Sequence, residues 1–159
     1  MKVGLTGHQN IGTAKDIQWV REAIINELLF DDIELGICSL AIGSDQLFAR
    51  ILLEKEVPLK VIIPSNGYEE TFTAEERESY FLLKNLASDI QILPFPQPSE
   101  EAFYEAGKTV VKQSDILVAI WNGRRARGLG GTGDIVQYGL SQRMKIIHIN
   151  PENHKIYKV

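Results

Sequence analysis

The sequence has a single cysteine, Cys38, among 159 residues. One thiol can form neither an internal disulfide nor a cysteine-rich metal site, and its apolar neighbours predict a reduced residue of the core. No apolar run approaches the roughly 20 residues needed to span a bilayer, and the first residues show no secretory signal pattern. We therefore expect a cytoplasmic protein that makes no membrane contact.

The chain also lacks an excess of positive charge. It carries 17 Lys and Arg against 21 Asp and Glu, a formal net charge of −4. General nucleic-acid binders usually present a basic face to the phosphate backbone. The overall charge therefore argues against nucleic acid as a partner.

Two common nucleotide-binding motifs are missing. The first glycine-bearing turn, residues 6–12, lacks the G-x-G-x-x-G pattern, and no acidic residue ends the second predicted strand, which argues against an NAD-dependent dehydrogenase. No G-x-x-x-x-G-K-[S/T] sequence occurs, so a P-loop kinase is excluded. The histidines have no partners at metal-ligand spacing, and we expect neither a metal site nor a bound cofactor.

Strands and helices alternate along the whole chain. Short apolar runs predict strands at 3–6, 35–40, 59–63, 90–93, 115–121 and 145–149, with a further short edge strand in the tail 151–159. Helical spacing predicts helices at 16–30, 46–55, 74–88, 99–113 and 132–142, with Thr13 and Ser99 as N-caps. This pattern predicts one α/β domain over residues 1–159, a three-layer Rossmann-like fold with a mainly parallel sheet of about six strands.

Three polar, glycine-bearing turns follow predicted strands, at 6–10, 42–45 and 122–133. Ligands of open parallel sheets bind beyond the carboxyl ends of the strands, so these turns are the candidate site. In the first turn, Gly7 would let a ligand approach the backbone, and His8 or Gln9 would touch it. The alternative is a plain helix-entry turn with a solvated histidine.

In the second turn, Gly43 permits close approach, and Ser44 or Asp45 is expected to cap the next helix. Asp45 is also a candidate contact for a ribose. A carboxylate at a helix N-terminus is stabilised as the anion. We therefore expect Asp45 to accept hydrogen bonds from sugar hydroxyls and to be a poor general acid.

The third turn combines a basic loop with a glycine-rich helix start, an arrangement that favours anions through free N–H groups and the helix dipole. The loop arginines could clamp phosphates in bidentate fashion, and the asparagine could read a base edge. The alternative is a mobile surface loop with solvated charges. The candidate ligand-binding residues here are Asn122, Arg124, Arg125, Arg127, Gly130, Gly131, Thr132 and Gly133.

Asp134 lies in the first turn of the last predicted helix and is its only carboxylate. It would either offset the helix dipole or contact a ribose and act as a base. It is the one candidate catalytic residue of the sequence.

Three segments together resemble the SLOG superfamily: Val3-Gly-Leu-Thr-Gly-His8, Leu40-Ala-Ile-Gly-Ser-Asp45-Gln-Leu-Phe-Ala49 and Gly130-Gly-Thr-Gly-Asp-Ile-Val-Gln-Tyr-Gly139. This superfamily spans the lonely-guy phosphoribohydrolases, the DNA-processing Rossmann domain and stand-alone nucleotide sensors. The resemblance covers nearly the whole chain in order. Residues 115–139 are also similar to nucleoside 2-deoxyribosyltransferases. The resemblance implies a nucleotide-binding Rossmann-like fold.

The sequence departs from both enzyme groups at the glutamate on which they depend. Aligned on the lonely-guy pattern, Gln137 stands where that glutamate belongs; aligned on the deoxyribosyltransferase pattern, Ile135 stands there and Asn122 replaces an aspartate. A glutamine can neither take a proton nor act as a carboxylate nucleophile.

Three functions follow from these observations. The first is a non-catalytic sensor or binding protein for a nucleotide or nucleotide-derived ribose phosphate. The second is an N-glycosidase, a phosphoribohydrolase or deoxyribosyltransferase in which Asp134 or Asp45 would support the chemistry. The third is a module that docks a protein or single-stranded DNA. Analogy with related folds is also compatible with a homo-oligomer.

Overall fold

The computed structural model describes residues 1–159 and contains one seven-stranded sheet with five α-helices around it. The strands are β1 (Lys2–Gly7), β2 (Leu35–Cys38), β3 (Leu59–Ile63), β4 (Asp89–Ile92), β5 (Ile116–Ile120), β6 (Lys145–Asn150) and β7 (Lys155–Lys158). The helices are α1 (Ala14–Glu27), α2 (Ser44–Glu54), α3 (Ala74–Asn85), α4 (Glu100–Lys112) and α5 (Thr132–Ser141), with 3₁₀ turns at Phe30–Asp32 and Tyr68–Thr71.

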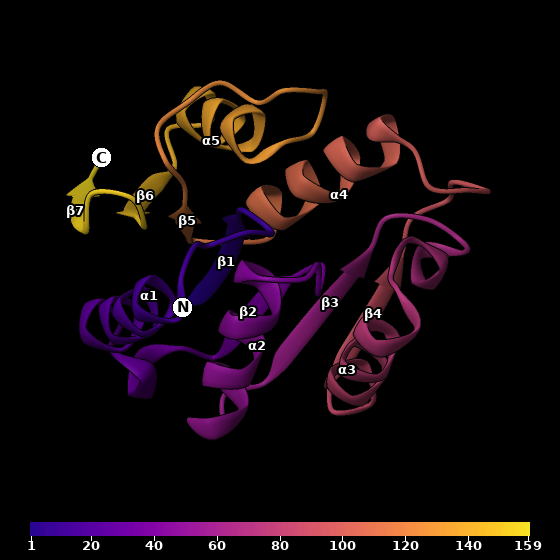
Figure 1. Cartoon of the computed structure of the whole chain (residues 1–159), viewed down its shortest axis with the longest axis horizontal. Coiled ribbons are helices and arrows are strands. Elements are labelled where there is room, and N and C mark those ends of the chain that lie inside the picture. The colour runs from indigo at the N-terminus through magenta and orange to yellow at the C-terminus, as the bar shows by residue number, and fades with distance from the viewer.

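The sheet has the order β4-β3-β2-β1-β5-β6-β7. Every neighbouring pair is parallel except β6 and β7, which are antiparallel. Figure 1 shows α1, α2 and α3 on one side of the sheet and α4 and α5 on the other. The predicted three-layer α/β architecture is therefore confirmed, and the tail adds the expected edge strand.

Each face of the sheet has its own apolar core. The larger core holds 25 buried residues between the sheet and α1, α2 and α3. The smaller core holds 11 between the sheet and α4 and α5. Burial on both faces explains why the central strands are continuous apolar runs rather than alternating ones. No helix combines the length and the apolar character that crossing a bilayer would require.

The capping residues fix where most helices begin. Thr13 and Asp16 form a capping box at the start of α1, and the Ser99 side chain accepts from the Ala102 N–H at the start of α4, both as predicted. The predicted cap of α2 is wrong. Gly43 is the N-cap without a side-chain bond, and Ser44 and Asp45 are the first two residues inside the helix.

The chain order places the switch point of the sheet between β1 and β5. From β1 the chain moves outward through β2 and β3 to β4, and α4 then carries it back across to β5 on the other side of β1. The helices after β1 and β5 therefore leave on opposite faces. A crevice opens between them at the carboxyl ends of the two strands.

Candidate ligand site at the carboxyl ends of β1 and β5

A cavity of about 1260 Å³ lies at this switch point, where Gly7 of β1 pairs with Ile120 of β5. It is lined by the loops after β1, β2, β3 and β5, by one side of α4 from Glu100 to Val110 and by the turn between β6 and β7. Most predicted site residues line it: Gly7, His8, Gln9, Asp45, Asn122, Arg124, Arg125, Arg127, Gly130, Gly131, Thr132 and Gly133. Three do not: Gly43, Ser44 and Asp134.

The first two turns are locked to each other. The Ser44 hydroxyl donates to the His8 carbonyl at 2.6 Å, and the Ser44 N–H donates to the same oxygen at 3.2 Å. A side chain at Gly7 would overlap Ser44, and one at Gly43 would overlap the backbone of Gln9. Gly43 also has a φ of +78°, in the region that favours glycine. The space next to these glycines is thus filled by the protein itself.

His8 is held in one protonation state. Its Nε2 accepts the Asn122 N–H at 3.0 Å, and a backbone N–H can only donate, so Nε2 is unprotonated and the neutral ring carries its proton on Nδ1. Burial lowers the pKa of His8, which further favours the neutral ring. The Nδ1–H makes no hydrogen bond within the protein, and His8 lines the cavity. The ring therefore offers one fixed donor to a ligand.

Asp45 is buried, with 7% of its surface exposed at the cavity wall. Its Oδ2 accepts the N–H groups of Ser39 at 2.9 Å and Ala41 at 3.3 Å, whereas Oδ1 has no partner in the protein. Burial raises the pKa of Asp45 to about 7, and the two N–H bonds only partly oppose this. The expectation of a carboxylate stabilised as the anion is wrong because desolvation outweighs the hydrogen bonds from the Ser39 and Ala41 N–H groups.

The third turn forms an uncapped helix start. Gly131 is the N-cap of α5 without a side-chain bond, and the N–H groups of Thr132 and Gly133 make no hydrogen bond within the protein. Free N–H groups at a helix start attract anions. A side chain at Gly133 would overlap the backbone of residues 124–126. The loop that carries Arg124, Arg125 and Arg127, here called the arginine loop, therefore packs over this helix start.

The Asp134 carboxylate points into the loop rather than the cavity. Its Oδ2 accepts the Gly130 N–H at 3.0 Å, which closes the glycine turn. Gln137, in the position of the enzyme glutamate, is exposed and does not line the cavity. Neither residue supplies a carboxylate to the cavity from α5.

Glu152, a residue that the sequence analysis missed, organises the start of the arginine loop. Its carboxylate accepts from the Asn122 side-chain amide at 3.3 Å and pairs with Arg124 at 3.2 Å. The Asn122 Oδ1 accepts the Arg124 N–H at 3.0 Å, so both polar atoms of the Asn122 side chain are engaged within the protein. Glu152 comes from the turn between β6 and β7, and no local pattern connects it to the loop.

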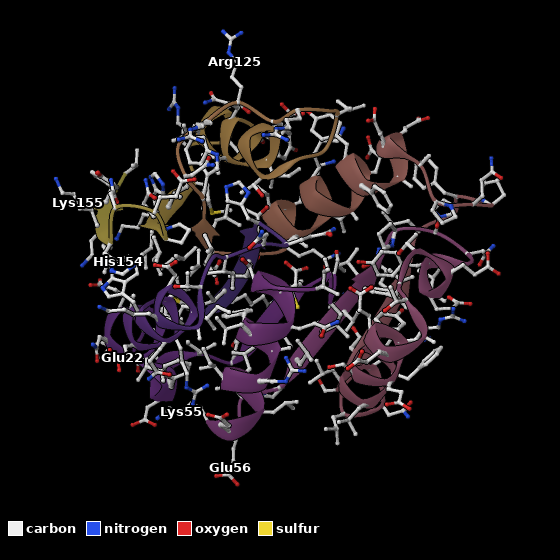
Figure 2. The ribbon with its side chains drawn as sticks, in the orientation of Figure 1. Glu22, Lys55, Glu56, Arg125, His154 and Lys155 are labelled. Atoms are coloured by element: carbon white, nitrogen blue, oxygen red, sulfur yellow. The ribbon has the colours of Figure 1, made fainter.

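Arg125 and Arg127 are exposed and form no ion pair. Figure 2 shows Arg125 projecting away from the body of the fold. These two guanidinium groups are the free cations of the loop. No group of three or more His, Cys, Asp or Glu residues is arranged to hold a metal ion.

Charge is divided unevenly between two parts of the chain. Residues 121–159 contain seven Lys and Arg against two Asp and Glu, a formal charge of +5. Residues 1–120 contain ten Lys and Arg against nineteen Asp and Glu, a formal charge of −9. The basic segment, residues 121–159, contains the arginine loop, α5, β6 and β7. The net charge of −4 conceals this division.

No family model matches the sequence, and no curated protein matches it. Solved structures do match its fold. DNA processing protein A from Streptococcus pneumoniae has a TM-score of 0.65 at 14% identity, over 92% of this chain and 49% of that chain. DNA processing protein A from Helicobacter pylori has a TM-score of 0.67 at 14% identity, over 93% of this chain and 64% of that chain. The chain spans about half to two thirds of their length.

The Helicobacter pylori structure is described as having a unique single-stranded DNA binding mode. This finding contradicts the expectation, based on overall charge, that nucleic acid is an unlikely partner. The expectation failed because net charge averages over the whole chain, whereas phosphates respond to the charge within a Debye length of about 10 Å. Over nearly all of its residues, the chain has the Rossmann-like fold found in DNA processing protein A.

Proposed function

We propose that this protein binds single-stranded DNA along the carboxyl ends of β1 and β5. The observation that carries the proposal is the arginine loop, which lines the cavity at the switch point with three of the seven cations of residues 121–159. Acidic residues line other parts of the cavity, so the phosphates would lie along the arginine loop rather than deep inside. These acidic residues are Asp16, Asp45, Glu76, Glu100 and Glu152. Phosphate contacts supply most of the affinity of sequence-independent DNA binding.

Within this site, three groups are free to contact phosphates. Arg125 and Arg127 form no ion pair, and the half-buried Thr132 at the start of α5 offers an unbonded N–H group. Arg124 is already paired with Glu152. The fold shared with DNA processing protein A, for which single-stranded DNA binding is described, supports the same proposal.

The direct test is fluorescence anisotropy with a labelled oligo-dT of about 12 nucleotides, within the usual site size. We expect affinity that falls with salt, and an Arg125→Ala/Arg127→Ala variant whose log–log salt slope is smaller by about 1.4, since each single-strand phosphate contact contributes about 0.7.

Lys15→Ala/Lys112→Ala is the matched control, because it removes two exposed, unpaired cations outside the basic segment. It should leave the slope unchanged. An equal decrease of the salt slope in both variants would mean that overall charge, and not the arginine loop, determines binding. The absence of oligo-dT binding by the unaltered protein at low salt would overturn the proposal.

A second candidate is binding of a nucleotide or ribose phosphate in the cavity, without turnover. It is favoured by the two cavity-facing groups without protein partners, the Nδ1–H of His8 and the Oδ1 of Asp45. Such a pair can hold an acceptor and a hydroxyl of one sugar or base.

A thermal-shift screen with nucleoside monophosphates and ADP-ribose tests this candidate. Ligand at 100 times its dissociation constant should add about 2.7 kcal/mol of stability. His8→Gln should reduce the shift while the fold persists. Release of free base from a bound ligand would instead support the N-glycosidase alternative. If no ligand raises the melting temperature, both the nucleotide-binding candidate and the N-glycosidase alternative fail.

A further inference from the structure

Three aromatic rings form a row across the last three strands of the sheet. The ring centroids of Trp121 and His148 are 4.9 Å apart, and those of His148 and Tyr157 are 5.1 Å apart. Trp121 directly follows β5, His148 lies in β6 and Tyr157 lies in β7. The row therefore runs from the arginine loop to the outer edge of the sheet.

Strand register places the row on the face of the sheet that carries α5. Ala119 pairs with His148, and His148 pairs with Tyr157. Ala119 belongs to the core beneath α4 and α5, and Trp121 packs against the same core. Because α5 packs on β1, β5 and β6, Tyr157 on the edge strand is left 42% exposed.

Hydrogen bonds hold all three rings in place. The Trp121 indole N–H donates to the Arg124 carbonyl at 2.8 Å, and the Nε2–H of His148 donates to the Trp121 carbonyl at 2.7 Å. The Asn153 amide donates to the Tyr157 hydroxyl at 3.1 Å. The outermost ring is thus fixed before any ligand arrives, which lowers the entropic cost of binding.

The charge around the row suits a polyanion. Lys155 lies two residues before Tyr157 on the same face of β7, is exposed and forms no ion pair. Figure 2 shows Lys155 at the β7 side of the molecule and Arg125 beyond the arginine loop. Free cations therefore lie near both ends of the aromatic row.

We propose that this row is a base-stacking platform, on which a base of single-stranded DNA stacks against Tyr157 while its phosphates lie between the arginine loop and Lys155. Aromatic rings beside a basic track are the usual means of holding single strands without sequence readout, because every base has a π-face. The inference rests on the proposed function and adds a second contact zone, outside the cavity.

Tyr157→Ala, Tyr157→Phe and Phe81→Ala are to be compared for binding to oligo-dT and to an abasic strand of the same length. Stacking predicts that Tyr157→Ala weakens oligo-dT binding at least about fivefold and leaves abasic-strand binding and the salt slope unchanged. Tyr157→Phe keeps the ring and loses only the hydrogen bond from Asn153, so it should bind oligo-dT more tightly than Tyr157→Ala does. Phe81, 40% exposed on α3, is the matched control and should have no effect.

Each outcome separates the two proposals. If the unaltered protein binds oligo-dT and Tyr157→Ala binds equally well, the platform is overturned and the proposed function stands. If Tyr157→Ala loses oligo-dT and abasic strand alike, the ring supports the fold rather than a base, and the platform is again overturned. If the unaltered protein binds neither strand, the proposed function itself fails.

Discussion

At the scale of single residues, Asp45 departs most from what its sequence context indicates. A carboxylate in the first turn of a helix usually ionises readily, yet burial raises the pKa of Asp45 to about 7. Near neutral pH the same side chain can therefore donate or accept a hydrogen bond at its free Oδ1. The sequence identified this residue as a candidate, and it lines the cavity, but its burial depends on packing from distant segments.

The raised pKa predicts a pH dependence of folding stability. The folded pKa lies above the unfolded value of about 3.9. The contribution of Asp45 to the free energy of unfolding is therefore fully present below about pH 4, and it is lost as the pH rises to about 7. Asp45→Asn keeps an oxygen acceptor for the Ser39 and Ala41 N–H groups and removes this titration.

Urea unfolding at pH 5 and pH 8 provides the measurement. Relative to the unaltered protein, we expect Asp45→Asn to gain stability on going from pH 5 to pH 8, by up to about 3 kcal/mol from the pKa difference. An identical difference in stability at the two pH values would mean that Asp45 is already ionised at pH 5.

At the scale of elements, the site depends on contact between the first two loops. Gly43 brings the start of α2 against the loop after β1, where Ser44 holds the His8 carbonyl. The sequence located these glycines as points of close approach. It did not identify the approaching group, because the sheet order that brings the loops together is a tertiary property.

Substitution of Gly43 tests this contact. Gly43→Ala would combine a φ of +78° with overlap on the Gln9 backbone. Gly123→Ala would impose a similar φ of +83° with nothing within 4 Å. The conformational cost alone is about 1–3 kcal/mol for a residue held in such a sparsely populated conformation.

We therefore expect Gly43→Ala to lower the free energy of unfolding, measured in urea, by clearly more than Gly123→Ala does. Equal effects would show that the two loops move apart at little cost. His8 would then lose the fixed position described for it.

At the scale of the whole molecule, the alternation of strands and helices was predictable because apolar runs and capping residues are local signals. The ends of Leu59–Ile63 and the caps at Thr13 and Ser99 follow directly from such signals. Glu152 and the aromatic row were not predictable, since they depend on which strands lie side by side. The uneven division of charge was visible in the sequence, but the single net charge of −4 concealed it.

That division has a direction in space. The Glu-rich segment, residues 69–78, lies with α3 beside β4, at one edge of the sheet. The basic segment ends in β7, at the opposite edge. The charge of the molecule is therefore polarised along the sheet, from the acidic α3 to the basic β7. A polyanion would turn the molecule so that the β7 end arrives first. Once bound, its acidic end would face outward and repel the acidic ends of neighbouring copies, which would space the molecules along a strand.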